Sequence, residues 1–564
     1  MNFTKQFKVG RPLPAEDRQF NHCRNTLCSN FAVPALIPND FGGYRNNESY
    51  TLSGSEREKV LKCTFCHDRY AIKSNKAAIE EYRRYAAYLN PLPKISCPQT
   101  ECAESNSKIQ RFGTSSSGST RYRCKNCGKT FSKSSNPTWK QKAPEKNSLI
   151  LRLLINKMPM RRMLETASIS PQTLYRKIEF FQTQCLKFAA RHEKKLEHMD
   201  FPVMHVSVDR QDYLVNWGSH VDRRSFMMHA VASSDGKSGF VFGVHPNFDP
   251  TLNLMEVELD ARERNDYALP TIYRHYSRLW LMGDYEKRPV TERFRVREKV
   301  ASDGADLADD KEETPEGKIP STGIQVRHEY VQYGHFLLLN KFLQKAKHVN
   351  FSLDQDPGLR QSCIAVFNRR IKKGTCDVFH LRIDKQLTVD QKDLVIAAAK
   401  NALDNYRRDK KMSRDAAAIE LIEKAILTIN PNLKTTDRWI SHPLPNRAEP
   451  NRAVCHLTPR PNQDVKALSN HIMDVSLKNI DRFFMLIRRR ISLLERPIKT
   501  PSSANRAWHG YSPYEPLVVC QVLDIFRVIF NYHLVGEDKR TTAMRIGLAH
   551  RPYTLDEILA EPRN

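Results

Sequence analysis

The sequence predicts a multidomain α+β protein in which two zinc ribbons and a helix-turn-helix precede a larger α/β domain with insertions. At about 100–200 residues per domain, a chain of 564 residues has room for several domains. Eight of its 13 cysteines lie in the first 127 residues, and from Phe201 the spacing of apolar residues changes from a helical to a strand-like period. With 40% apolar and 27% charged residues, the composition excludes extensive disorder.

The net charge of the chain indicates which class of partner it binds. Ninety Lys and Arg against 63 Asp and Glu leave a net charge of +27, which favours binding to a polyanion, above all nucleic acid. A basic membrane-surface protein is the alternative, but we find neither a polybasic amphipathic anchor nor a lipidation signal. No apolar run approaches the roughly 20 residues of a membrane span, and the start MNFTKQFKVGRPLP lacks the apolar core of a signal peptide. We therefore expect no membrane partner and a cytoplasmic, nucleoid-associated protein with reduced cysteines.

The N-terminal cysteines fall into two sets with the same spacing. In each set, two cysteines separated by four residues (the x4 pair) are followed by two separated by two residues (the x2 pair). The flanking sequences VLKCTFCHDRYAIKSN and RYRCKNCGKTFSKSS echo each other, which indicates a duplicated module. Four thiolates on two short turns suit tetrahedral Zn²⁺, and a module of about 40 residues needs such a metal to fold. We expect two structural zinc ions, in modules spanning 1–92 and 93–140. The predicted ligands are Cys23, Cys28, Cys63 and Cys66 for the first ion, and Cys97, Cys102, Cys124 and Cys127 for the second.

Two other interpretations of these cysteines exist. Buried free cysteines would need no metal, but the repeated spacing disfavours them. In the first set the gap between the two pairs is long, and His22 and His67 offer alternative ligands.

A helix-turn-helix is predicted within residues 141–200. Residues 103–200 hold 20 Lys and Arg against 7 Asp and Glu, a net charge of +13. Helices are expected at 147–156 and 160–167, followed by a turn and a third helix that Ser170 caps and Pro171 begins. Recognition helices present their N-terminal half to the major groove. The predicted DNA-binding residues are Gln172, Thr173, Tyr175, Arg176 and Lys177. The alternative is a plain helical bundle that links two domains.

The α/β domain is predicted over residues 201–500, with insertions near 252–347 and 405–464 and a helical region at 501–564. Within the first insertion, the acidic segment 302–317 is predicted to be a mobile surface loop. The expected strands are 203–217, 225–234, 239–245, 349–354 and 376–384. The expected helices are 328–347, 357–371, 389–408, 414–427 and one long helix over 465–494.

Carboxylates are expected at the ends of two strands. Asp209 ends HVSVD and Asp354 ends NFSLD, and carboxylates at neighbouring strand ends are a way to hold Mg²⁺. Such residues also cap turns, so the pair alone is weak evidence of a site. In the predicted long helix, Asp474, Asp481 and Arg488 are spaced seven apart and would share a face. This pattern would serve phosphodiester chemistry, although a solvated charged face is the commoner reason for it.

Three features together resemble bacterial insertion-sequence transposases of the DDE class. They are the motif CPQTEC followed by RYRCKNCGKTF, the helix-turn-helix, and the order of the acids, in which two strands that end in Asp are followed by a helix that carries an acidic residue. The likeness is to the insertion-sequence-one type and covers residues 97–185 and patches of 203–500. It implies an RNase H-like catalytic domain and a homo-oligomer that cleaves and joins double-stranded DNA at the element ends and the target. It also implies two catalytic Mg²⁺ ions, with Asp209 bridging both, Asp354 holding one and the helix acid the other.

The third acid departs from the family pattern. In the family that acid is usually Glu, and Lys or Arg follows seven residues later; here the pattern falls on Asp481 and Arg488. Asp474 and Glu495 therefore stay open as third ligands. Two alternative functions also stay open: a non-catalytic or domesticated DNA-binding regulator, and a structure-directed nuclease with the same core.

Overall fold

The structure is a computed structural model. It describes residues 10–40, 42–55, 59–90, 97–99, 102, 108–116, 120–133, 136–216, 225–286, 323–384, 386–495, 498–499, 507–508, 513 and 515–562. The acidic segment 302–317 lies outside these residues. The chain divides into two compact units. Unit one comprises 1–85, 197–486 and 496–517, and unit two comprises 86–196, 487–495 and 518–564.

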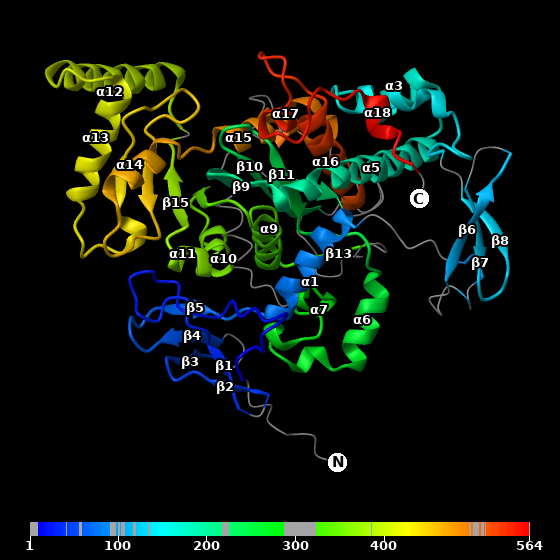
Figure 1. The fold of residues 1–564 in the computed structure, drawn as a ribbon, viewed down its shortest axis with the longest axis horizontal. Coiled ribbons are helices and arrows are strands. Elements are labelled where there is room, and N and C mark those ends of the chain that lie inside the picture. Colours follow the sequence, from blue (N-terminus) through cyan, green and yellow to red (C-terminus); the bar gives the residue numbers. More distant parts are fainter. Residues whose placement is uncertain are drawn as a thin grey trace. The chain divides into compact units, whose positions relative to one another are not determined.

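A seven-stranded mixed sheet forms the centre of unit one (Figure 1), in the order β11-β10-β9-β14-β15-β17-β16. The first three strands pair antiparallel, β14 is parallel to both β9 and β15, and the last two strands pair antiparallel again. The strands are β9 (Val203–Asn216), β10 (Ser225–Asp235), β11 (Val241–Pro246), β14 (His348–Leu353), β15 (Cys376–Arg382), β16 (Trp439–Ser441) and β17 (Ala453–His456). All five predicted strands are therefore present, and the predicted second insertion contributes two more.

One face of this sheet is apolar and carries the main core. Successive strand residues alternate between faces, so Val206, Val208 and Phe351 share this side. Helices α9 (His328–Phe342), α10 (Pro357–Val366) and α11 (Asn368–Lys372) belong to the chain segments around β14. The ring of Phe351 contacts Phe336 of α9 at 5.7 Å and Phe367 at 4.6 Å between centroids. The hydrophobic effect thus holds α9 and α10 against this face.

The opposite face is polar, and helices α14 (Val465–Met473) and α15 (Lys478–Arg490) lie against it. The prediction of a single helix over 465–494 is wrong, because the chain leaves the helix between Met473 and Lys478. In this break the backbone binds side chains of other segments: the carbonyl of Ser476 accepts from Ser207 of β9, and that of Val475 accepts from Arg452. These bonds replace helical ones and anchor the break to the sheet.

The N-terminal module also belongs to unit one. Its strands are β1 (Leu36–Pro38) and β2 (Tyr44–Asn46), which form one hairpin, and β3 (Tyr50–Gly54), β4 (Lys59–Cys63) and β5 (Arg69–Ala71), which form a second sheet. Helix α1 (Asn75–Ala86) follows and crosses α9 closely, since a Cβ at Gly334 of α9 would lie 3.0 Å from the ring of Tyr85. This module is therefore packed on the helices that cover the apolar face.

Two insertions extend unit one. The first contains β12 (Phe248–Asp249), α6 (Leu254–Glu263), α7 (Met282–Glu286) and β13 (Ile324–Gln325). The second contains α12 (Val389–Asp409) and α13 (Arg414–Leu427), which lie beyond the β15 side of the sheet (Figure 1). Arg278 of the first insertion pairs with the buried carboxylates of Asp249 and Glu81, at 2.8 and 2.9 Å, and so ties the insertion to α1.

Unit two contains a three-stranded sheet and a helical bundle. The sheet strands are β6 (Ile109–Thr114), β7 (Thr120–Cys124) and β8 (Thr130–Lys133), and the helices are α3 (Asn147–Leu154), α4 (Met160–Ala167), α5 (Pro171–Glu193), α16 (Pro516–Tyr532), α17 (Thr542–Ile546) and α18 (Leu555–Leu559). The bundle buries an ion pair between Arg527 and Glu193, 2.8 Å apart. In the described part of the chain, none of the helices combines the length and apolar character of a membrane span.

Candidate functional site

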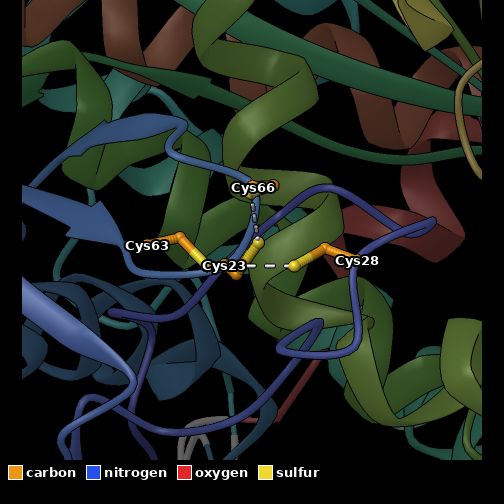
Figure 2. A group of neighbouring side chains, drawn as sticks. All are labelled: Cys23, Cys28, Cys63 and Cys66. Atoms are coloured by element: carbon orange, nitrogen blue, oxygen red, sulfur yellow. Dashed lines mark hydrogen bonds between the residues drawn. The ribbon is translucent and has the colours of Figure 1, made fainter.

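The first four cysteines converge on one point of the N-terminal module (Figure 2). The Sγ atoms of Cys23 and Cys66 are 3.6 Å apart, and those of Cys28 and Cys63 are 3.8 Å apart. Four sulfurs bound to one zinc at about 2.3 Å would be separated by about 3.8 Å, so the set fits a tetrahedral ion. The four Sγ atoms all lie within 4.8 Å of one another, and neither His22 nor His67 belongs to this group.

The surroundings of this cluster suit thiolates. Asn30 donates to Cys28 from its backbone N–H and to Cys63 from its side-chain amide, each at 3.4 Å. Burial raises the pKa of Cys23 and raises that of Cys66 to about 12, whereas hydrogen bonds outweigh burial and lower that of Cys63 to about 7. Thiolates at Cys23 and Cys66 therefore need a compensating cation. The sulfurs also form part of the small core of the module, together with Tyr50, Leu61 and Ile72. A zinc ion would therefore complete both the charge balance and the core.

The second set, Cys97, Cys102, Cys124 and Cys127, is likewise gathered within 4.8 Å. Its x2 turn repeats that of the first set in detail. The N–H of Gly128 donates to the carbonyl of Cys124, as that of His67 donates to Cys63, and both residues have a positive φ, of 69° and 59°. The two modules thus share a strand–turn–strand unit, and His67 serves in it as a backbone position.

The two cysteine modules differ in their setting. The first packs on α9 and α10: Arg24 donates to the Tyr333 hydroxyl at 2.8 Å and to Gln361 at 2.6 Å, and His22 contacts the Asn368 amide at 2.9 Å. The second belongs to unit two, with the predicted helix-turn-helix. The first cluster is therefore part of the folded unit that holds the central sheet.

Helices α3, α4 and α5 lie where the helix-turn-helix was predicted, and the Ser170 hydroxyl accepts from the Thr173 N–H as the expected cap of α5. Gln172, Tyr175 and Arg176 are exposed on the N-terminal half of α5. Thr173 and Lys177 are buried, and the Lys177 ammonium donates to the Ala143 carbonyl and the Asn147 side chain. Lys177 therefore holds the bundle together and does not face a DNA groove.

The first two predicted acids lie side by side. Leu353 of β14 pairs with Val208 of β9 in parallel register, so Asp354, the next residue, follows at the level of Asp209. Asp209 shares the polar face with Ser207, two residues before it. It is not at the end of β9, as predicted, because β9 continues to Asn216 beside β10. Asp209 is instead the first residue of β9 beyond its last pair with β14, which is Val208 with Leu353.

An ion-pair network fixes this pair of acids. Arg210, next to Asp209, pairs with Asp356 at 2.8 Å, and Asp356 in turn caps α10 by accepting from the N–H groups of Gly358 and Leu359. Burial alone would raise the pKa of Asp356, but the Arg210 charge and these two N–H groups lower it below its usual value. The turn that carries Asp354 is thereby tied to β9.

The third predicted acid, Asp481, lies in the first turn of α15. The start of this helix is held by Glu449, a fully buried carboxylate that accepts from the Leu477 N–H at 2.7 Å and the Ser476 hydroxyl at 2.8 Å. Arg452 pairs with the other oxygen of Glu449 at 2.9 Å. Because Ser476 is also bonded to Ser207, the helix that carries Asp481 begins at the strand that carries Asp209.

The structure separates Asp474 and Glu495 from this arrangement. Asp474 ends α14, half exposed, and pairs with His205 at 3.2 Å, whereas Glu495 follows α15 and pairs with Lys157 within unit two. Arg488 lies two turns beyond Asp481 on α15. Among the described residues, the oxygens of Asp209, Asp354 and Asp481 do not form a set all within 4.8 Å, in contrast to the cysteines.

Sequence reasoning missed Glu449 and Arg452. They lie in a proline-containing segment without periodicity, and only their spacing of three could have indicated a pair. In a comparison with known proteins, no protein-family model and no curated protein matches this sequence.

We expect the cysteine clusters to hold two zinc ions, one each. Cys63→Ser should remove one zinc and destabilise unit one, because its cluster is packed on α9 and α10, whereas Cys124→Ser should remove one zinc and unfold the second ribbon alone. Elemental analysis combined with limited proteolysis tests both. An unchanged zinc content in either variant would contradict the assignment.

Glu449→Gln should lower the thermal unfolding midpoint and speed amide exchange at Leu477. The change leaves Arg452 as a buried charge without its partner, which typically costs about 3–5 kcal/mol. Glu263→Gln, at an exposed position on α6, is the matched control and should change neither quantity. If both variants behave alike, Glu449 does not anchor α15.

Proposed function

We propose that this chain is a DDE-type DNA transposase with an RNase H-like catalytic domain, which cleaves and joins double-stranded DNA at element ends and target. One observation carries the proposal. Strand β14, which ends one residue before Asp354, is parallel to β9 in a register that brings Asp354 to the level of Asp209, and the helix with Asp481 begins against the same strand. A mixed sheet with acids at these positions is the arrangement that the resemblance to DDE transposases predicts.

The residues suit metal-assisted phosphodiester chemistry. Asp209, Asp354 and Asp481 would supply the oxygen ligands that Mg²⁺ prefers, and bound Mg²⁺ would activate a water or 3′-hydroxyl and stabilise the leaving oxygen. Asp481 is one methylene shorter than the Glu of the family, and the anchoring of α15 by Ser476 and Glu449 keeps it at the sheet. Arg488, further along the helix, would bind a DNA phosphate.

Unit two would bind the DNA. Gln172, Tyr175 and Arg176 are the exposed residues on the N-terminal half of α5 that could reach base edges. The second ribbon adds a basic surface, on which Arg121 and Arg123 lie over the Phe112 ring at 6.0 and 5.5 Å. Such cations bind phosphates independently of sequence. A homo-oligomer on DNA is part of the proposal, since two ends must be joined.

Asp209→Ala, Asp354→Ala and Asp481→Ala should each abolish cleavage of a cognate end with Mg²⁺ or Mn²⁺ and leave specific binding nearly unchanged. Asp474→Ala and Glu495→Ala should keep activity, because these residues already pair with His205 and Lys157. A strand-cleavage assay on all five variants makes the comparison. Full activity of Asp481→Ala would overturn its role. A wild-type protein that binds the end but is inactive with every divalent metal would favour the non-catalytic regulator.

Arg176→Glu should weaken binding to the element end by about 1–3 kcal/mol, and wild-type binding should fall steeply with salt. Arg191→Glu, near the other end of α5, is the matched control with the same charge change. Lys177→Met should instead lower stability, because its ammonium bonds inside the bundle. Equal affinities of the two Glu variants across a salt series would remove α5 from the recognition surface.

A further inference from the structure

We propose that unit one carries a third transition-metal site, distinct from both cysteine clusters and from the acids discussed above. Its ligands are His348 at the start of β14, Asp377 of β15 and His471 of α14. One ligand atom of each lies within 4.8 Å of the other two. Two imidazoles and a carboxylate are a ligand set for Zn²⁺ that leaves a fourth position for water.

The site lies at the opposite end of β14 from Asp354. Asp354 follows His348 by six positions, which is about 20 Å at roughly 3.3 Å per strand residue. The proposal therefore does not depend on the transposase assignment. Asp377 is nearly inaccessible, at 1% exposure, whereas His348 and His471 are partly exposed and give an ion access from solvent.

Surrounding groups orient each ligand. One oxygen of Asp377 is held by His456 Nε2 at 2.9 Å and by Arg460 Nη1 at 3.2 Å, while the other contacts His348 Nε2 at 3.0 Å and accepts from Arg460 Nη2 at 3.3 Å. The Asn350 amide nitrogen contacts Nδ1 of His471 at 2.9 Å. For Nε2 of that ring to bind an ion, Nδ1 must carry the proton, and the Asn350 amide must turn so that its Oδ1 accepts from Nδ1–H. Such outer contacts fix ligand orientation at metal sites.

Two buried polar atoms beside the ligands point independently to a missing partner. Asn350 Oδ1 and His205 Nδ1 have no hydrogen bond, although the residues are only 1% and 4% exposed. His205, Asn350 and Asp377 are register partners across three adjacent strands, so they form one row on the polar face. An unsatisfied buried polar atom is costly, and a His471 ring that binds an ion through Nε2 would donate its Nδ1–H to Asn350 Oδ1 and satisfy it.

The rings of His348 and His471 are stacked, with centroids 4.6 Å apart and planes at 9°. A nitrogen must point at the ion, so coordination requires one ring to turn out of this stack. The turn and the nearby Arg460 charge should make the site weaker than the cysteine clusters.

The test uses the full-length protein with its cysteine-bound zinc, dialysed against a mild chelator and then titrated with ZnCl₂ in a calorimeter. We expect one further equivalent to bind. His348→Ala and His471→Ala should each abolish this uptake, and His456→Ala should weaken it about 10–100-fold through the loss of Asp377 support. His550→Ala, an exposed histidine of unit two, is the control and should bind as the wild type does.

Anomalous scattering at the zinc edge from wild-type crystals soaked in ZnCl₂ locates the ion even if the histidine variants fail to fold. A peak between His348, Asp377 and His471 would support the site. No further equivalent in the wild type, uptake that survives in His348→Ala and His471→Ala, or a peak elsewhere would overturn it.

Discussion

The parallel pairing of β14 with β9 is the constraint on which the candidate active site depends. These strands are separated by well over one hundred residues, yet the register of Leu353 with Val208 sets Asp354 and Asp209 beside each other. A shift by one residue would turn every side chain of β14 to the other face. The apolar residues of the strand prevent that shift, because Phe351 must reach the rings of Phe336 and Phe367. Core packing on one face thus fixes the positions of the acids at the other.

The third acid depends on a different kind of interaction. Asp481 is positioned by buried polar groups: Ser207 donates to the turn before α15, and Glu449 accepts from the Leu477 N–H and the Ser476 hydroxyl in that turn. The Glu449–Arg452 pair comes from the second insertion, so this insertion helps to build the site and is not merely an appended module. Burying such a pair adds little net stability, but it allows only one geometry at the start of α15.

The sequence was sufficient to predict those elements that a local pattern of residues determines. Five strands, the three helices around Ser170 and the cysteine sets follow from apolar period, capping residues and spacing. Prediction from the sequence failed for elements whose structure depends on contacts with distant parts of the chain. Strands β16 and β17 are only three and four residues long, too short for a periodic signal. The break before Lys478 arises from backbone bonds to distant side chains. The burial of Lys177 could have been foreseen, since it lies beside the apolar stripe of Leu174, Ile178 and Phe181.

The duplicated cysteine modules show how one local motif serves two structural purposes. Their turns share the same backbone bonds and left-handed residue, so the metal-binding unit is set by local sequence alone. What differs is the surface around it. In the first module Arg24 and His22 bond to the helices that cover the central sheet. The second module instead exposes Arg121 and Arg123 on its strands. Residues outside the four cysteines therefore decide whether a module packs on the helices of unit one or exposes basic side chains.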